Sequence, residues 1–368
     1  MEVVSLVRPG IPLGVVWMAA EIPLETRQVV EGIADVSLST LSSEQIANAA
    51  TPRTGVYVLA NDRVVRWLSA FLGSFRAYNP DVALCLIPFN DASAECEKLV
   101  QEAGGFVHRD PGQFRELEGI GAALELGATA TGHHWFRRFA AFDGPFDRFA
   151  YLDCRMVVLG ALARFINAPD AFGVPLVHYD VALNQVYEDG PIRRAFCRDG
   201  GGHGFMSGIW ASRKGLFSMA DMQATGRELV AVRQQMNRRN TDQFFLNYLC
   251  DSHGLRVCHI ADLDGRLAHC AWANDRGSIY ESSDGLWRKW DFGGLQHKRQ
   301  MLFVHWAGTR LQPWMPHYFL HQRFRRYRVG PAAAVAERVL RPIGQVGRIA
   351  RGNRWLNTFY HAYVRREA

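Results

Sequence analysis

Short apolar runs alternate with amphipathic segments along the middle of the chain. Residues 56–60 are an unbroken apolar run, and residues 64–75 repeat large apolar side chains every three to four positions. The alternation continues through an apolar run at 82–88, an amphipathic segment at 92–103 and the pair Phe106-Val107. Such runs are typical of buried parallel strands, and the longer spacing is typical of helices packed against a sheet. The pattern predicts an α/β fold with a mostly parallel, twisted sheet and helices on both faces.

Polar residues follow the predicted strands. Ala60-Asn61-Asp62 ends the first strand, and Asn90-Asp91 follows the second. Ligands of open parallel sheets bind at the carboxyl ends of strands, so we expect this edge to carry a binding site. Further along, the pattern predicts a helix over 133–142, a strand over 149–152, a short strand at 209–211, a helix over 241–250 and a strand over 301–304.

Charge divides the chain into three parts. The net charge is +6, but residues 1–50 carry six acidic side chains against Arg8 and Arg27, and residues 319–368 carry eleven arginines against two glutamates. The body between them is close to neutral, so it is not expected to bind nucleic acid. We therefore predict an acidic N-terminal extension (1–54), one large domain (55–318) and a basic helical tail (319–368).

The basic tail has an amphipathic pattern. At 100° per residue, valines and isoleucines between 335 and 349 fall on one side of a helix and arginines on the other. We expect two short helices, because Pro342, Gly344 and Gly347 interrupt the run. The pattern predicts that 331–366 binds an anionic membrane surface, with packing against the acidic extension as the alternative.

The cysteines bear on the cellular compartment. The seven cysteines form no CxxC pair, and no apolar run approaches the ~20 residues that span a bilayer. Scattered cysteines in a chain of this length indicate a reducing compartment. We expect a cytoplasmic protein, peripheral on the inner face of the membrane.

Four segments resemble motifs of the GT-A glycosyltransferases, especially the family 8-like group that includes glycogenin and bacterial galactosyltransferases. In chain order they are similar to that group's YLDxDxVV strand, its FNSG segment, its DQxxLN segment and its HxxG segment followed by Pro-Trp. Here they read FAYLDCRMVV (149–158), FMSGIWASRKG (205–215), TDQFFLN (241–247) and HWAGTRLQPW (305–314). With 56–62 as the first nucleotide-binding strand, the resemblance covers about residues 55–318.

The resemblance implies a GT-A-type, Rossmann-like fold and an enzyme of the hexosyltransferase kind. Such an enzyme moves a sugar from a nucleotide diphosphate sugar, for which we expect a UDP-sugar, to a glycan, polysaccharide or lipid-linked acceptor, with retention of configuration. The implied catalytic residues are Asp242 and Gln243, beside the anomeric carbon. The implied donor-binding residues are Ala60, Asn61, Asp62, Arg137, Arg138, Asp153, Arg155, Ser207, Gly208, His305 and Gly308.

Arg155 departs from the family pattern, because it stands where the second aspartate of the DxD pair is usual. In the family, two carboxylates and the late histidine hold Mn²⁺ or Mg²⁺, so the resemblance leaves Asp153 and His305 as metal ligands. Arg155 can instead pair with phosphate oxygens in place of the metal, since guanidinium binds phosphate in a bidentate geometry. Because a cation beside a metal repels it, we expect metal-independent or weakly metal-dependent action. A third alternative is a catalytically silent sugar-nucleotide-binding or scaffold subunit.

Several of these residues also have a plainly structural interpretation. Asp242 can cap its helix, Arg137 and Arg138 can lie on an exposed helix face, and His305 can be a core histidine. Three tryptophans of the 268–300 stretch can stack on an acceptor sugar or pack in the core: Trp272, Trp287 and Trp290. We expect His133 and His134 to point to different sides of their helix and not to share a metal.

Overall fold

The computed structural model describes residues 53–124, 132–180, 185–197, 204–237, 241–274, 278–290, 299–326 and Val335. The acidic extension up to residue 52 and all of the basic tail after Arg326 except Val335 lie outside these ranges. The helices of the tail and its membrane binding therefore stay predictions. Within the described residues, no helix combines the length and the apolar composition needed to cross a membrane.

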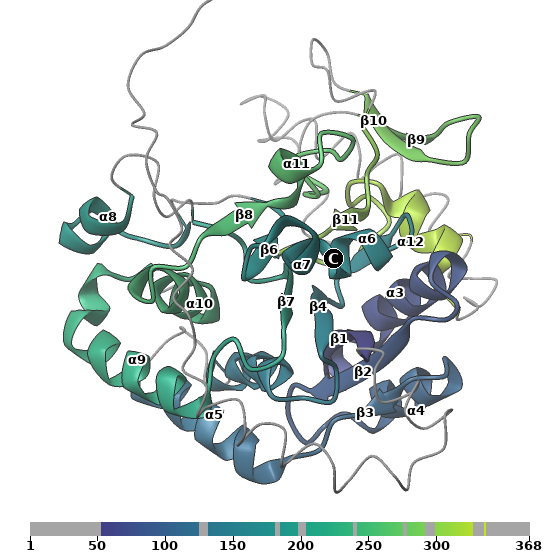
Figure 1. Ribbon diagram of the computed structural model, residues 1–368. Helices are drawn as coiled ribbons and strands as arrows, with labels where there is room; N and C mark the ends of the chain where they lie inside the picture. Colours follow the sequence, from purple (N-terminus) through teal and green to yellow (C-terminus); the bar gives the residue numbers. More distant parts are fainter. Residues whose placement is uncertain are drawn as a thin grey trace, which may run out of the picture. The chain divides into compact units, whose positions relative to one another are not determined.

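Within the described residues, seven strands form one mixed sheet in the order β3-β2-β1-β4-β7-β6-β8 (Figure 1). Strand β1 runs parallel to β2 and β4, whereas β7 is antiparallel to both of its neighbours, β4 and β6. The predicted α/β fold with a mostly parallel sheet is confirmed. The strands are β1 (Thr54–Ala60), β2 (Ala83–Pro88), β3 (Phe106–Val107), β4 (Arg148–Asp153), β6 (Leu176–His178), β7 (Ile209–Arg213) and β8 (Val257–His259).

Four further strands pair outside this sheet. Strand β5 (Met156–Val158) pairs with β11 (Phe303–His305), and β9 (Ser278–Glu281) pairs with β10 (Trp287–Trp290). The α-helices are α3 (Val65–Tyr78), α4 (Ala94–Glu102), α5 (Pro111–Ala123), α6 (Ala163–Ile166), α7 (Ala168–Phe172), α8 (Pro191–Phe196), α9 (Met219–Val232), α10 (Thr241–Ser252), α11 (Ile260–Leu263) and α12 (Tyr318–Phe324). Short 3₁₀ helices cover Asp62–Val64 and Arg233–Gln235, and a longer one covers Gly132–Phe142.

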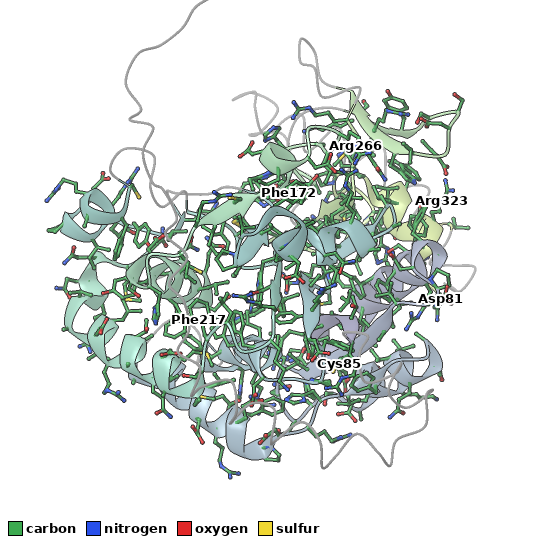
Figure 2. The ribbon with its side chains drawn as sticks, in the orientation of Figure 1. Asp81, Cys85, Phe172, Phe217, Arg266 and Arg323 are labelled. Carbon is green, nitrogen blue, oxygen red and sulfur yellow. The ribbon has the colours of Figure 1, made fainter. Side chains whose placement is uncertain are left out.

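The two faces of the sheet are covered by different helices. Alternate residues of β1 point to opposite faces, so Val56 and Val58 pack with α3 and α4 while Tyr57 and Leu59 pack with α5, α9 and α10. Side chains fill both layers (Figure 2), and the labelled Cys85 and Phe217 belong to the second. Burying each large apolar side chain of these layers contributes about 1.5–3 kcal/mol to the fold.

The predicted elements agree with the structure where local pattern is strong and differ where it is weak. The predicted strands at 56–60, 82–88 and 149–152 correspond to β1, β2 and β4. The segment 133–142 is a 3₁₀ helix and not the expected α-helix, and α5, α9 and β6 lie in stretches where we predicted no element. Trp287 is a core residue: it is 2% exposed, and its indole N–H donates to the Tyr78 hydroxyl at 2.7 Å.

Candidate functional site

The site lies where β1 and β4 end. These strands are parallel and in register, with Leu59 opposite Asp153, so Ala60 and Asp153 reach the same edge of the sheet. Strand β11 brings His305 to this edge, because it pairs with β5 immediately after Arg155 and sets His305 opposite Met156. The Trp306 N–H also donates to the Arg155 carbonyl at 2.8 Å. Residues from both halves of the domain thereby meet at the end of β4.

Asp153 and His305 form a close pair. The Oδ2 atom of Asp153 lies 3.3 Å from Nε2 of His305, whose side chain is 1% exposed. Burial opposes the charge of Asp153, but the contact with His305 and the charges of Arg138 and Arg155 outweigh it and lower the pKa of this carboxyl. Asp153 is therefore ionised at neutral pH. Both ring nitrogens of His305, Nδ1 and Nε2, are buried without a hydrogen-bond partner among the described residues, so the approach to Asp153 is a close contact without hydrogen-bond geometry.

Gly208 closes one side of this pair. Its carbonyl accepts from the Asp153 N–H at 2.8 Å. A Cβ atom at position 208 would lie 2.8 Å from Cε1 of His305 and 3.3 Å from Oδ2 of Asp153. The close approach leaves no room for a side chain, which is a physical reason for glycine in the FMSG segment.

Arg138 is buried at the centre of the site, contrary to the exposed-face interpretation. Its Nη1 lies 2.8 Å from Oδ2 of Asp242 and donates to the carbonyl and the hydroxyl of Ser207, both at 2.9 Å. The guanidinium also stacks over the rings of Trp135 and Tyr151. Burial opposes its charge, but the charge of Asp242, together with smaller contributions from neighbours that include Tyr151 and Asp153, outweighs burial and raises the pKa of Arg138. Arg138 therefore joins the FMSG segment to the start of α10.

Gln243 fastens α10 to the same segment. Its Oε1 accepts from the Ser207 N–H at 3.4 Å, and its Nε2 donates to the Gln185 carbonyl at 3.2 Å. Asn247, one turn later, pairs with both the N–H and the carbonyl of Phe205 at 2.9 Å. The side-chain amide of Gln243 therefore binds backbone groups of two other segments, and the residue is 4% exposed.

A cavity of about 170 Å³ opens beside Asp153. Its lining comes from the ends of β1 and β4, the segments that follow β1, β2 and β4, and the 3₁₀ helix Gly132–Phe142: Leu59, Ala60, Asn61, Arg63, Val64, Phe89, Asn90, Trp135, Asp153, Cys154 and Arg155. Asn61 donates to the Asn90 side chain at 3.2 Å. Sequence reasoning placed Asn90 at this edge but missed Arg63, Phe89 and Trp135 as lining residues. The position of Phe89 directly after a predicted strand was the available signal.

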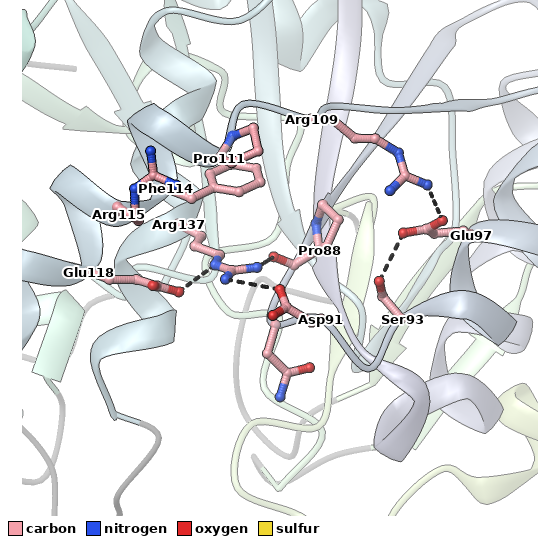
Figure 3. Close-up of a pocket in the computed structure, with 11 residues that line it drawn as sticks. Pro88, Asp91, Ser93, Glu97, Arg109, Pro111, Phe114, Arg115, Glu118 and Arg137 are labelled. Atoms are coloured by element: carbon pink, nitrogen blue, oxygen red, sulfur yellow. Dashed lines mark hydrogen bonds and ion pairs between the residues drawn. The ribbon is translucent and has the colours of Figure 1, made fainter.

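A second cavity of about 520 Å³, shown in Figure 3, shares the lining residue Asn90 with the first. Arg137 lines it, and its guanidinium contacts Glu118, the Pro88 carbonyl at 3.2 Å and Asp91 at 3.5 Å. Arg137 and Arg138 therefore lie in different parts of the site: Arg137 lines the larger of these two cavities, whereas Arg138 contacts Asp242. The sequence gave no indication that Glu118 belongs to the site, because it lies in α5, a helix that the hydrophobic pattern did not predict.

The expectation that His133 and His134 point to different sides of their helix is wrong. Their ring centroids lie 4.0 Å apart, and His134 Nδ1 is 2.6 Å from Glu118 Oε1, so the three side chains converge. The side chains of these neighbours turn together around the Glu118 carboxylate instead of diverging on a regular α-helix. Arg137 Nε donates to the same carboxylate oxygen of Glu118.

Two predicted donor-binding residues have structural contacts. Asp62 Oδ1 accepts from the Cys96 N–H at 3.0 Å, which caps the first turn of α4. Gly308 adopts a left-handed φ of 66° in the turn after β11, a conformation that favours glycine. Neither is among the residues that line the cavity beside Asp153.

Among the described residues at the end of β4, Asp153 and His305 do not by themselves form a complete cage for a divalent cation. Within the described residues, groups of three or more His, Cys, Asp or Glu side chains close enough to share an ion occur at Glu118-His133-His134 and at His259-Asp262-His269. No such group contains Asp153 or His305. The donor set at the end of β4 is one carboxylate, from Asp153, and one imidazole, from His305, and the guanidinium of Arg155 lines the same cavity as Asp153.

Comparisons with known proteins give similarity of structure and not of sequence. No protein-family model and no curated protein sequence matches the chain. Solved structures of glycosyltransferases match this chain at low sequence identity. The galactosyltransferase LgtC, in complex with donor and acceptor sugar analogs, is 14% identical over 77% of this chain and 99% of its own, with a TM-score of 0.47. The bifunctional glycosyltransferase WbbM is 13% identical over 75% of this chain and 50% of its own, with a TM-score of 0.47.

A further solved structure is the core-mannan synthase A of Aspergillus fumigatus in its Mn/GDP form. It is 9% identical over 58% of this chain and 74% of its own, with a TM-score of 0.37. All three are glycosyltransferases, the class that the four sequence segments resemble. At these identities and TM-scores the likeness does not decide what this chain binds or transfers.

Proposed function

We propose that this chain is a glycosyltransferase that moves a sugar from a nucleotide diphosphate sugar to a hydroxyl group of a glycan or lipid-linked acceptor. The observation that carries the proposal is the convergence of the four motif segments at the end of β4. Asp153 contacts His305 and Gly208, and Arg138 connects Ser207 to Asp242. Charged and polar groups held this rigidly beside a cavity are what transfer from a charged donor requires.

The reaction exchanges one bond of the anomeric carbon for another. The bond from this carbon to the diphosphate oxygen breaks, and a bond to the acceptor oxygen forms. The acceptor proton passes to the departing diphosphate, so the products are the glycoside and a nucleoside diphosphate. With retention of configuration, which we propose from the sequence resemblance, the acceptor approaches on the face that the diphosphate leaves.

The site residues divide these tasks. Asp242 lies at the start of α10 with its side chain 10% exposed, and its carboxylate can stabilise the positive charge that develops on the sugar. Asp153 is ionised and borders the cavity, so it can accept a hydrogen bond from a sugar hydroxyl. Arg138 and Gln243 act as positioning residues, because their polar groups bind protein atoms.

The test is Asp242→Asn, which keeps the shape of the side chain and removes its charge. A thermal-shift screen of nucleotide sugars first identifies the donor, since a bound donor raises the melting temperature by mass action. We expect transfer to fall by about 100-fold or more while donor affinity, measured by calorimetry, stays within about threefold. Asp81→Asn, at an exposed position labelled in Figure 2, is the matched control and should change neither quantity.

Two results would contradict this proposal in different ways. Unchanged turnover in Asp242→Asn removes Asp242 from the mechanism. Donor binding without transfer or hydrolysis, for every acceptor offered, supports instead the silent sugar-nucleotide-binding subunit. That second reading is favoured by one observation, the arginine at position 155 where the family pattern has a carboxylate.

A further inference from the structure

Arg155 places a fixed positive charge on the wall of the cavity that Asp153 borders. The two residues line the same cavity of about 170 Å³, and the Arg155 side chain is half-buried. Among the described residues, no hydrogen bond or ion pair engages its guanidinium. Arg138 and Arg137 differ in this respect, because Arg138 is bound to Asp242 and Ser207 and Arg137 to Glu118. Arg155 is therefore available to an anion that enters the cavity.

Protein groups lie close to the Asp153 carboxylate on two sides. Asp153 Oδ2 lies 3.3 Å from His305 Nε2 and against Gly208, where even a Cβ atom would come within 3.3 Å. The charges of Arg138 and Arg155 also act on this carboxylate. Mg²⁺ and Mn²⁺ prefer several oxygen ligands, and a guanidinium beside the single carboxylate repels them.

We propose that the site binds the diphosphate of its donor without a divalent cation, and that the Arg155 guanidinium supplies the positive charge in its place. This inference rests on the proposed glycosyl transfer and names how its leaving group is held. A guanidinium matches phosphate oxygens with two parallel N–H donors and keeps its charge at every physiological pH. It therefore stabilises the negative charge that grows on the diphosphate as the sugar leaves.

The experiment measures binding of UDP, and of GDP in parallel, by calorimetry in excess EDTA and in Mn²⁺. For the unaltered chain we expect the dissociation constant to agree within about twofold between the two buffers. Arg155→Asp restores a second carboxylate beside Asp153. We expect this variant to lose affinity by about 100-fold or more in EDTA and to regain most of it in Mn²⁺.

Arg63→Asp is the matched control, since Arg63 lines the same cavity and loses the same charge. We expect weaker binding in this variant and no recovery with Mn²⁺, because position 63 lies in the 3₁₀ helix after β1, whereas position 155 follows Asp153 at the end of β4. Paramagnetic resonance of Mn²⁺ without nucleotide gives a second readout: the Arg155→Asp variant should bind the ion more tightly than the unaltered chain.

The outcomes separate this inference from the proposed function. If EDTA abolishes UDP or GDP binding by the unaltered chain and Mn²⁺ restores it, the inference is wrong while the donor site stands. If neither nucleotide binds in either buffer, both fall together. The chelator comparison on the unaltered chain needs no variant to fold, so it decides the matter even if Arg155→Asp is unstable.

Discussion

The buried pair Arg138–Asp242 gives the sharpest test of how the site is built. Its two side chains are only 2% and 10% exposed and approach to 2.8 Å. Removing one partner of such a pair leaves an uncompensated buried charge, which costs about 3–5 kcal/mol. We therefore expect Arg138→Met to lower the free energy of unfolding by this amount. At 2–4 °C for each kcal/mol in a domain of this size, the melting temperature should fall by roughly 6–20 °C.

A double-mutant cycle isolates the interaction itself. Replacing both partners, Arg138→Met with Asp242→Leu, removes both charges, so the double variant should be more stable than the sum of the single losses predicts. Urea unfolding followed by tryptophan fluorescence gives the four free energies. Lys98→Met and Glu102→Leu are the matched control, since that pair is 4.0 Å apart with side chains 77% and 56% exposed and should contribute about 0.5 kcal/mol or less.

The cycle has a clear contrary result. If Arg138→Met and Asp242→Leu each cost less than about 1 kcal/mol and their effects add, the pair contributes little to the fold. The Asp242 carboxylate would then be held by other groups, and Arg138 would lose its assignment as a positioning residue.

Three further predictions concern single residues. Gly208→Ala should reduce transfer about 100-fold, because the added Cβ would lie only 2.8 Å from Cε1 of His305 and would push the imidazole away. A small displacement of a site residue is enough to misalign the reacting groups. Normal turnover in this variant would refute the close approach of Gly208 to His305. Gly119→Ala, in α5 with no atom within 4 Å of the added Cβ, should raise stability by about 0.5–1 kcal/mol in the same urea assay. His259 is 5% exposed, and burial, with the charge of His269, lowers its pKa to about 4 from 6.5. The unfolded chain therefore gains this proton first as pH falls, and stability should drop by up to about 3 kcal/mol between pH 6.5 and 4. His259→Gln should make the free energy of unfolding less dependent on pH in this range. An unchanged slope in this variant would contradict the role assigned to His259.

The sequence by itself determined the elements with strong local pattern. Apolar runs at 56–60, 82–88 and 149–152 predicted β1, β2 and β4, because an unbroken apolar run must be buried on both faces of a sheet. The order of the four motif segments also came from the sequence, and with it the choice of Asp153, Asp242 and His305. Elements with weaker periodicity, such as α5 and α9, are decided by what packs against them and were missed.

Only the tertiary structure decided what these side chains contact. The distance between Asp153 and His305 depends on the register of β5 with β11, which no local pattern encodes. The burial of Arg138 depends in the same way on how the 3₁₀ helix Gly132–Phe142 packs beneath β4 and α10. Only the tertiary structure shows that Asp62 caps the first turn of α4 and that Arg155 lines the cavity. The physical reason is that propensity and periodicity act over a few neighbouring residues, whereas the site is built from contacts between segments far apart in the chain.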